Sequence, residues 1–220
     1  MACAGGENSA FERFADDVQA FAVSWKSMKS LDEYLRDAED AHGHLCAGQV
    51  LGVRMAILGL GKLGIDDPRG KDRKRLVTFV EIDRCATDAV AVVTGCRLGK
   101  RALKFRDWGK VAATFVDVST GQAIRISARE SSKTLARQMH PELDSKNQQQ
   151  MLAYREMSDD DLFSTQWVKV ELPAEEFPGY KGERTVCEIC GEGINFRREV
   201  RRYGKLLCRA CAGESYYQPL

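Results

Sequence analysis

The 220-residue sequence lacks a long apolar run, a secretory leader and an excess of charge of either sign. Its longest apolar stretch, residues 47–61, includes Gln49 and Arg54 and is shorter than the ~18–20 residues that a membrane-spanning helix needs. The first 14 residues show no basic region followed by an apolar segment. Lysine and arginine total 33 and aspartate and glutamate 32, so the whole-chain charge of +1 gives no signal for nucleic acid or an anionic membrane. We therefore expect a soluble, cytoplasmic protein.

Histidine is also scarce, with three residues, whereas cysteine is frequent, with eight. Inside a cell thiols are usually kept reduced, so clustered cysteines are more typical of metal ligands or reactive thiols than of disulfides. Apolar residues make up 44% of the chain and charged residues 30%, a globular composition that excludes a disordered or collagen-like chain. The chemistry of the protein is expected where cysteine and histidine cluster.

The apolar periodicity predicts helices interleaved with strands. Apolar residues at steps of three or four predict an amphipathic helix over residues 11–28, and a capping box at Ser30–Glu33 predicts another over 31–40. A helix with four glycines follows over 47–63, which indicates close approach of another backbone or a ligand. Further helices are expected over 85–94, 131–139 and 145–157, and strands over 76–82, 111–118, 123–128 and 167–172.

The strands over residues 111–118 and 123–128 are joined by Ser-Thr-Gly-Gln, a good hairpin signal. A hairpin excludes an all-parallel sheet, so we predict an α+β fold with a mixed or antiparallel sheet. Residues 173–185 contain two prolines, two glycines and several charges, which is typical of a linker. We predict a first domain over residues 1–178 and a second over 179–220.

The second domain contains two Cys-x-x-Cys pairs separated by seventeen residues, Cys187/Cys190 and Cys208/Cys211. Four soft thiolates suit one tetrahedral Zn²⁺, and a closed four-thiolate site leaves no coordination position for catalysis. The segment is too short to fold on an apolar core alone, so the metal is expected to stabilise it. Disulfides and an iron–sulfur cluster are the alternatives, and we favour a structural zinc in a small treble-clef-like finger.

Four arginines lie between the two pairs: Arg197, Arg198, Arg201 and Arg202. They could contact phosphates, or they could form a solvated hairpin whose charge offsets the two negative charges of a zinc tetrathiolate. We favour the solvated hairpin or a protein partner, and we do not expect nucleic acid as the partner.

A second cluster lies in the first domain, where His42, His44 and Cys46 alternate at the start of the glycine-rich helix. In an extended turn the two imidazoles point to one side, and a cysteine at a helix start lies at the positive end of the helix dipole. That position favours the thiolate, the form that binds metal or acts as a nucleophile. We therefore predict a metal or thiol site here.

Asp83 and Cys85 directly follow a predicted buried strand, where active groups commonly lie, and Cys96 lies in a turn whose glycines and Lys100 suit an anion. Packing of small residues is the alternative for either cysteine taken alone. The predicted metal ligands of this domain are His42, His44, Cys46, Cys85 and Cys96. The predicted catalytic residues are Cys46, Cys85, Asp83 and Lys100, with Asp88 as an alternative base.

These motifs resemble the FmdE family, which takes its name from the E component of formylmethanofuran dehydrogenase. The resemblance spans about residues 30–172 and rests on His-Gly-His-Leu-Cys-Ala-Gly at 42–48, Glu-Ile-Asp-Arg-Cys-Ala-Thr-Asp at 81–88, Val-Thr-Gly-Cys-Arg-Leu-Gly-Lys at 93–100 and the segment 107–115. The four-cysteine segment is similar to the treble-clef zinc finger that many members carry.

The resemblance implies an α+β core that dimerises, a metal-associated site around the His-x-His-x-Cys motif, and association with other subunits of a molybdenum or tungsten enzyme. Because other members often have an aromatic residue at the position of His42, it favours His44 and Cys46 as ligands. Three functions follow as hypotheses: an accessory or stand-alone metal-binding homologue, a zinc-dependent hydrolase or lyase, and a zinc-finger regulator that binds nucleic acid.

Overall fold

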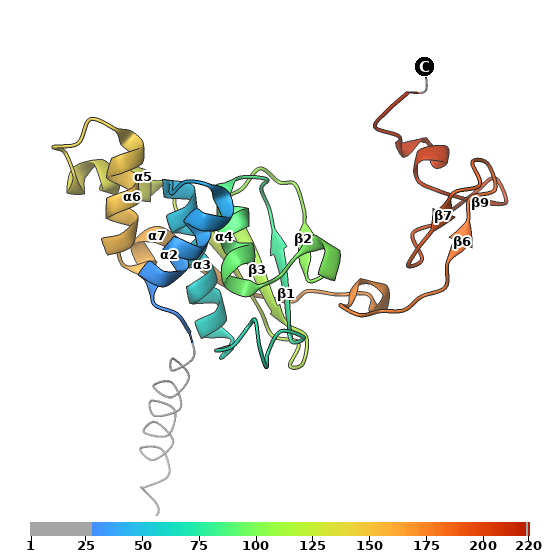
Figure 1. Cartoon of the computed structure of the whole chain (residues 1–220), viewed down its shortest axis with the longest axis horizontal. Coiled ribbons are helices and arrows are strands. Elements are labelled where there is room, and N and C mark those ends of the chain that lie inside the picture. The colour runs from blue at the N-terminus through green and yellow to red at the C-terminus, as the bar shows by residue number, and fades with distance from the viewer. Residues whose placement is uncertain (1–27, 219) are drawn as a thin grey trace, which may run out of the picture. The chain divides into compact units, whose positions relative to one another are not determined.

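Figure 1 shows the computed structural model of the chain, which describes residues 28–218 and 220. The helix predicted over residues 11–28 lies outside the described residues except for Met28. The chain forms two compact units, with the boundary between Val170 and Glu171. Among the described residues, no helix combines the length and the apolar character needed to cross a membrane.

The first unit has the predicted α+β fold, built on a five-stranded mixed sheet with the order β2-β1-β3-β4-β5. β1 and β2 pair in parallel, and the other neighbouring strands pair antiparallel. The predicted hairpin is confirmed as β3 and β4. The strands are β1 (Leu76–Val80), β2 (Leu103–Phe105), β3 (Ala112–Asp117), β4 (Ala123–Ala128) and β5 (Phe163–Val168).

Local signals place the helices of this unit. α2 begins with the predicted capping box, because Ser30 Oγ accepts from the Glu33 N–H and the Glu33 carboxylate accepts from the Ser30 N–H at 2.8 Å. α4 ends at Gly95, whose φ of 69° suits a residue without a Cβ. The helices are α2 (Leu31–His42), α3 (Ala47–Lys62), α4 (Cys85–Thr94), α5 (Ser131–Met139), α6 (Lys146–Glu156) and α7 (Asp159–Leu162), with the 3-10 turn η1 (Leu98–Lys100) before β2.

The glycine-rich helix α3 lies at the centre of the unit, against α4 and the sheet (Figure 1). The predicted close approach is confirmed at two of its glycines. A Cβ at Gly52 would overlap the carbonyl oxygen of Ala86 and lie 2.8 Å from the Cβ of Ala89, and a Cβ at Gly59 would overlap the ring of Phe115. The missing side chains therefore let α3 pack directly on the backbone of α4 and on the sheet.

Two strands differ from the sequence prediction. The strand predicted over residues 167–172 lies earlier, at Phe163–Val168, where it pairs with β4 along the edge of the sheet. Its residues between Phe163 and Val168 are exposed, so its apolar pattern is weak and its position is set by pairing. β2 was not predicted, because three residues carry no readable period.

The second unit contains two short hairpins followed by a single helical segment. β6 (Thr185–Val186) pairs with β7 (Gly193–Ile194), β8 (Val200–Arg202) pairs with β9 (Lys205–Leu207), and η3 (Ala210–Glu214) follows. The two-residue loop between β8 and β9 has φ of 52° at Tyr203 and 72° at Gly204, as its tight turn requires. The buried core consists of Cys187, Ile194, Leu207 and Ala212.

Candidate metal centres

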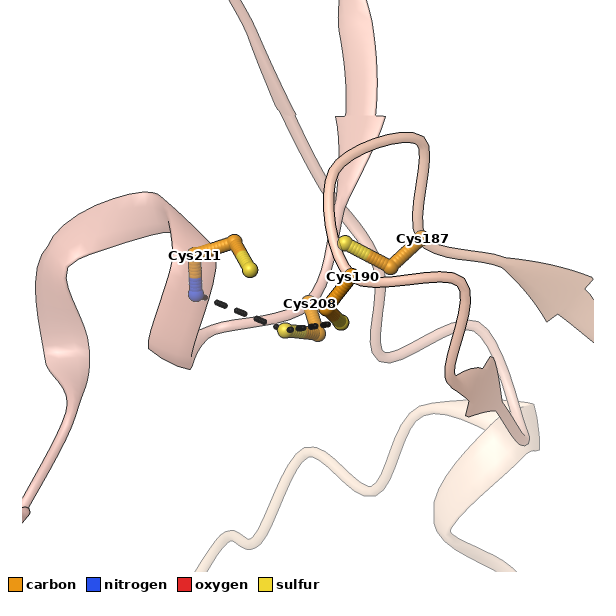
Figure 2. A group of neighbouring side chains, drawn as sticks. All are labelled: Cys187, Cys190, Cys208 and Cys211. Atoms are coloured by element: carbon orange, nitrogen blue, oxygen red, sulfur yellow. Dashed lines mark hydrogen bonds between the residues drawn. The ribbon is translucent and has the colours of Figure 1, made fainter. Parts of the chain in front are cut away.

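The four cysteines of the second unit converge on one point (Figure 2). Their sulfur atoms all lie within 4.8 Å of one another, and the Sγ atoms of Cys190 and Cys208 are 3.8 Å apart. Tetrahedral zinc with Zn–S bonds of ~2.3 Å places its sulfur ligands about 3.8 Å apart. The hairpins and η3 thus bring the four thiols to the spacing that one zinc ion needs.

The protonation of these thiols also points to a cation. Backbone N–H groups, first that of Cys190 and then that of Cys208, lower the pKa of Cys187 to about 6. The hydrogen bond with Cys208, followed by burial and the other two thiols, raises the pKa of Cys211 to about 12. Four thiols this close cannot all ionise without a positive ion among them, and a divalent metal supplies that charge.

Two of the finger's four arginines make contacts within the finger. The Arg198 guanidinium lies 5.8 Å from the ring centre of Phe196, and that of Arg202 lies 5.1 Å from the ring centre of Tyr203. Arg202 also donates a hydrogen bond to the carbonyl oxygen of Ala212, which ties β8 to η3. These contacts give the two arginines a role in the fold, and the choice of partner stays a prediction.

The first unit brings together a second set of metal-ligating groups, from His42, Cys46 and Cys85. One ligand atom from each lies within 4.8 Å of the others. His42 is the last residue of α2, Cys46 is the N-cap of α3, and Cys85 is the first residue of α4. Three helix ends therefore build the site, and both cysteines lie at helix N-termini, which favour a thiolate.

Asp88 fixes the orientation of His42. Its Oδ2 lies 2.9 Å from Nδ1 of His42, which leaves Nε2 as the nitrogen available to a metal. A carboxylate behind a metal-binding imidazole is the usual arrangement, because it sets the tautomer and the ring direction. Burial, and then the hydrogen bond with Cys46, raise the pKa of Cys85, so the two thiols share protons in the absence of a cation.

The structure separates His44 and Cys96 from this group. The His44 ring lies 4.8 Å from the His42 ring, but His44 is exposed in the turn after α2 and is not one of the three converging residues. Cys96 is 3% exposed and packs in the core beside Thr78. Cys85 begins α4 and Cys96 follows its end, and a helix of 10 residues spans about 15 Å. The length of α4 therefore keeps Cys96 away from the site.

The other predicted catalytic residues divide in the same way. Asp83 lines a pocket together with His42 and Cys85, whereas Lys100 is exposed and is not part of the pocket wall. Asp88, considered in the sequence only as a base, is the hydrogen-bond partner of His42. Its position three residues after Cys85 hinted at the same side of α4. The eighth cysteine, Cys3, lies outside the described residues.

Two protein families match the two parts of the chain. Residues 41–164 match the family described as "FmdE, Molybdenum formylmethanofuran dehydrogenase operon". Residues 181–217 match the "Prokaryotic dksA/traR C4-type zinc finger". The finger match and the four converging cysteines together support a structural zinc in the second unit.

Two similar proteins span most of the chain. A protein from Archaeoglobus fulgidus named "Probable S-adenosyl-L-methionine-binding protein" is 31% identical over 92% of this chain, which spans 59% of that relative. The crystal structure of a tungsten formylmethanofuran dehydrogenase FmdE-like protein from Syntrophus aciditrophicus superposes with a TM-score of 0.60 at 25% identity. That match covers 86% of this chain and 96% of the solved one.

Proposed function

Because the chain belongs to the FmdE family, we propose that it is a metal-binding protein with two unlike sites, a structural zinc in the finger and an open site at His42, Cys46 and Cys85. In this proposal the protein is an accessory or stand-alone homologue of the FmdE component of formylmethanofuran dehydrogenase. The finger stabilises the second unit, and the open site carries the chemistry.

The observation that carries the proposal is the convergence of two cysteines and one histidine beside a pocket. Zinc sites with four protein ligands are structural, whereas sites with three keep a position for water or substrate, and two cysteines with one histidine are a known set of this kind. A divalent ion held by the three residues would act as a Lewis acid toward a group at its fourth position.

The residues around the open site have separate tasks in this proposal. Asp88 holds the His42 ring in one orientation. The N-termini of α3 and α4 stabilise the two thiolates. Asp83, exposed on the pocket rim, is placed to accept a proton if the site catalyses a hydrolase or lyase step.

Metal analysis tests the proposal directly. Protein purified without chelators is expected to contain about two ions per chain, and a Cys46→Ala/Cys85→Ala variant about one, because only the finger then retains its ligands. Cys96→Ala is the matched control, since it also removes a thiol from the first unit but outside the group, and it should keep both ions. One ion in the wild type would confine metal to the finger and contradict the open site.

We also propose that the protein forms a homodimer and associates with other subunits of a molybdenum or tungsten enzyme. The family supports this, and so does Trp167, which is 57% exposed on the edge strand β5. Exposed aromatic residues at a sheet edge are typical of interaction surfaces. Light scattering during size-exclusion chromatography is expected to give twice the chain mass, and a Trp167→Lys variant should shift it toward the monomer. A monomeric wild type would contradict the dimer.

A further inference from the structure

A pocket of about 420 Å³ lies beside the open site, at the carboxyl ends of the parallel strands β1 and β2. His42 and Cys85 form part of its wall, together with the first turn of α4. Ligands commonly bind at this place in a strand–helix–strand unit, because the strand ends and the helix start leave a crevice between them. The pocket and the metal site therefore share two residues.

One side of this pocket is apolar. Val80 and Phe105 are paired across β1 and β2, and Leu103 lies two residues before Phe105 on the same face of the sheet. Val80 and Leu103 are buried, whereas Phe105 is 40% exposed and Leu98, from η1, is 65% exposed. Large apolar side chains left exposed beside a few polar groups are typical of a surface that receives a ligand.

The polar side of the pocket offers little net charge to a ligand. Asp88 is hydrogen-bonded to His42, and Asp83 lies next to Arg84, which has the opposite charge. Two thiolates, one imidazole and a divalent cation sum to zero. A strongly anionic ligand such as a phosphate ester is thus not favoured, and the soft cysteine ligands favour a metal that accepts nitrogen or sulfur donors.

We infer that the pocket binds a neutral small molecule with one nitrogen or sulfur donor and a flat apolar group. The donor takes the open position of the metal, and the apolar group lies against Leu98 and Phe105. This inference rests on the proposed function, because the donor requires a metal at His42, Cys46 and Cys85. It adds the class of ligand and the two residues that select it.

The test compares imidazole with 4-phenylimidazole on the full chain loaded with Co²⁺, whose visible absorption changes when a ligand binds. The finger holds its ion with four thiolates and leaves imidazole no position, so the open site alone responds. The Cys46→Ala/Cys85→Ala variant provides the blank. We expect 4-phenylimidazole to bind about ten to one hundred times more tightly than imidazole, because the phenyl ring is removed from water.

Variants of the apolar wall separate the inference from the metal site. In Leu98→Ala/Phe105→Ala the ratio of the two affinities should fall to about one to three, while imidazole binds as in the wild type. Because Phe105 belongs to β2, Leu98→Ser provides a second variant at an exposed position, with the ratio lowered severalfold. Leu152→Ala, which removes a leucine 41% exposed on α6 and outside the pocket wall, is the matched control and should keep the full ratio.

Each outcome bears on one of the two proposals. Co²⁺ bands from the first unit together with equal affinities for the two ligands, or with a ratio that neither wall variant lowers, would overturn the inference and leave the metal site in place. If the spectrum of the wild type matches that of the blank, no ion binds at His42, Cys46 and Cys85. The proposed function is then wrong and the inference falls with it.

Discussion

Removal of the finger's zinc is expected to unfold residues 181–217 while the first unit stays folded. The buried core of the finger consists of Cys187, Ile194, Leu207 and Ala212, too few residues to offset the conformational entropy of the segment. Structural zinc contributes about 10–16 kcal/mol of apparent binding free energy at pH 7 in zinc-finger peptides. The folding of this unit therefore depends on the ion far more than on its apolar contacts.

Amide ¹H–¹⁵N spectra of the full chain measure this effect. A strong chelator should move the finger resonances to random-coil positions and leave those of the first unit dispersed, because that unit has a large core of its own. Zinc added back should restore the spectrum. Cys208→Ala should reproduce the chelated spectrum without chelator, whereas Cys96→Ala, in the first unit, should not. Finger resonances that stay dispersed after the ion is removed would contradict the structural role of the zinc.

The sequence predicted best those features that are encoded by neighbouring residues. The capping box at Ser30 and Glu33 and the glycine after Thr94 mark helix ends within a few residues, and the structure confirms both. The finger is a local feature in the same sense, since two Cys-x-x-Cys pairs define its ligands by spacing alone. The short strand β2 has no such signal, because it forms only by pairing with β1. The pocket that depends on β2 could not be predicted either.

The open site shows the same division at the level of single residues. The motif around residues 42–46 marked the region, but it could not choose between His42 and His44. The choice depends on Asp88, 46 residues later in the sequence, which pairs with His42. Cys85 and Cys96 were equally plausible ligands in the sequence, and the length of α4 decides between them. Tertiary packing, which one sequence does not reveal, selected the ligands.

Gly52→Val is expected to lower the stability of the first unit by about 3 kcal/mol, or about 6–12 °C in its melting temperature. A Cβ at Gly52 would overlap the Ala86 carbonyl oxygen and lie 2.9 Å from the Ala86 Cα, and backbone atoms cannot rotate away. Helices α3 and α4 would have to separate. Gly99→Val is the matched control, since nothing lies within 4 Å of a Cβ at Gly99, and thermal unfolding followed by circular dichroism compares the two.

The same substitution tests whether this contact positions the open site. Cys46 begins α3 and Cys85 begins α4, so helices pushed apart at Gly52 carry the two thiols apart. Gly59→Val is the informative comparison, because its Cβ would strike the ring of Phe115 on the sheet and leave the α3–α4 contact alone. Both variants should be destabilised, but only Gly52→Val should lose the ion of the first unit, from about two ions per chain to about one. Equal metal content in two folded variants would show that the site does not depend on the close approach of the two helices.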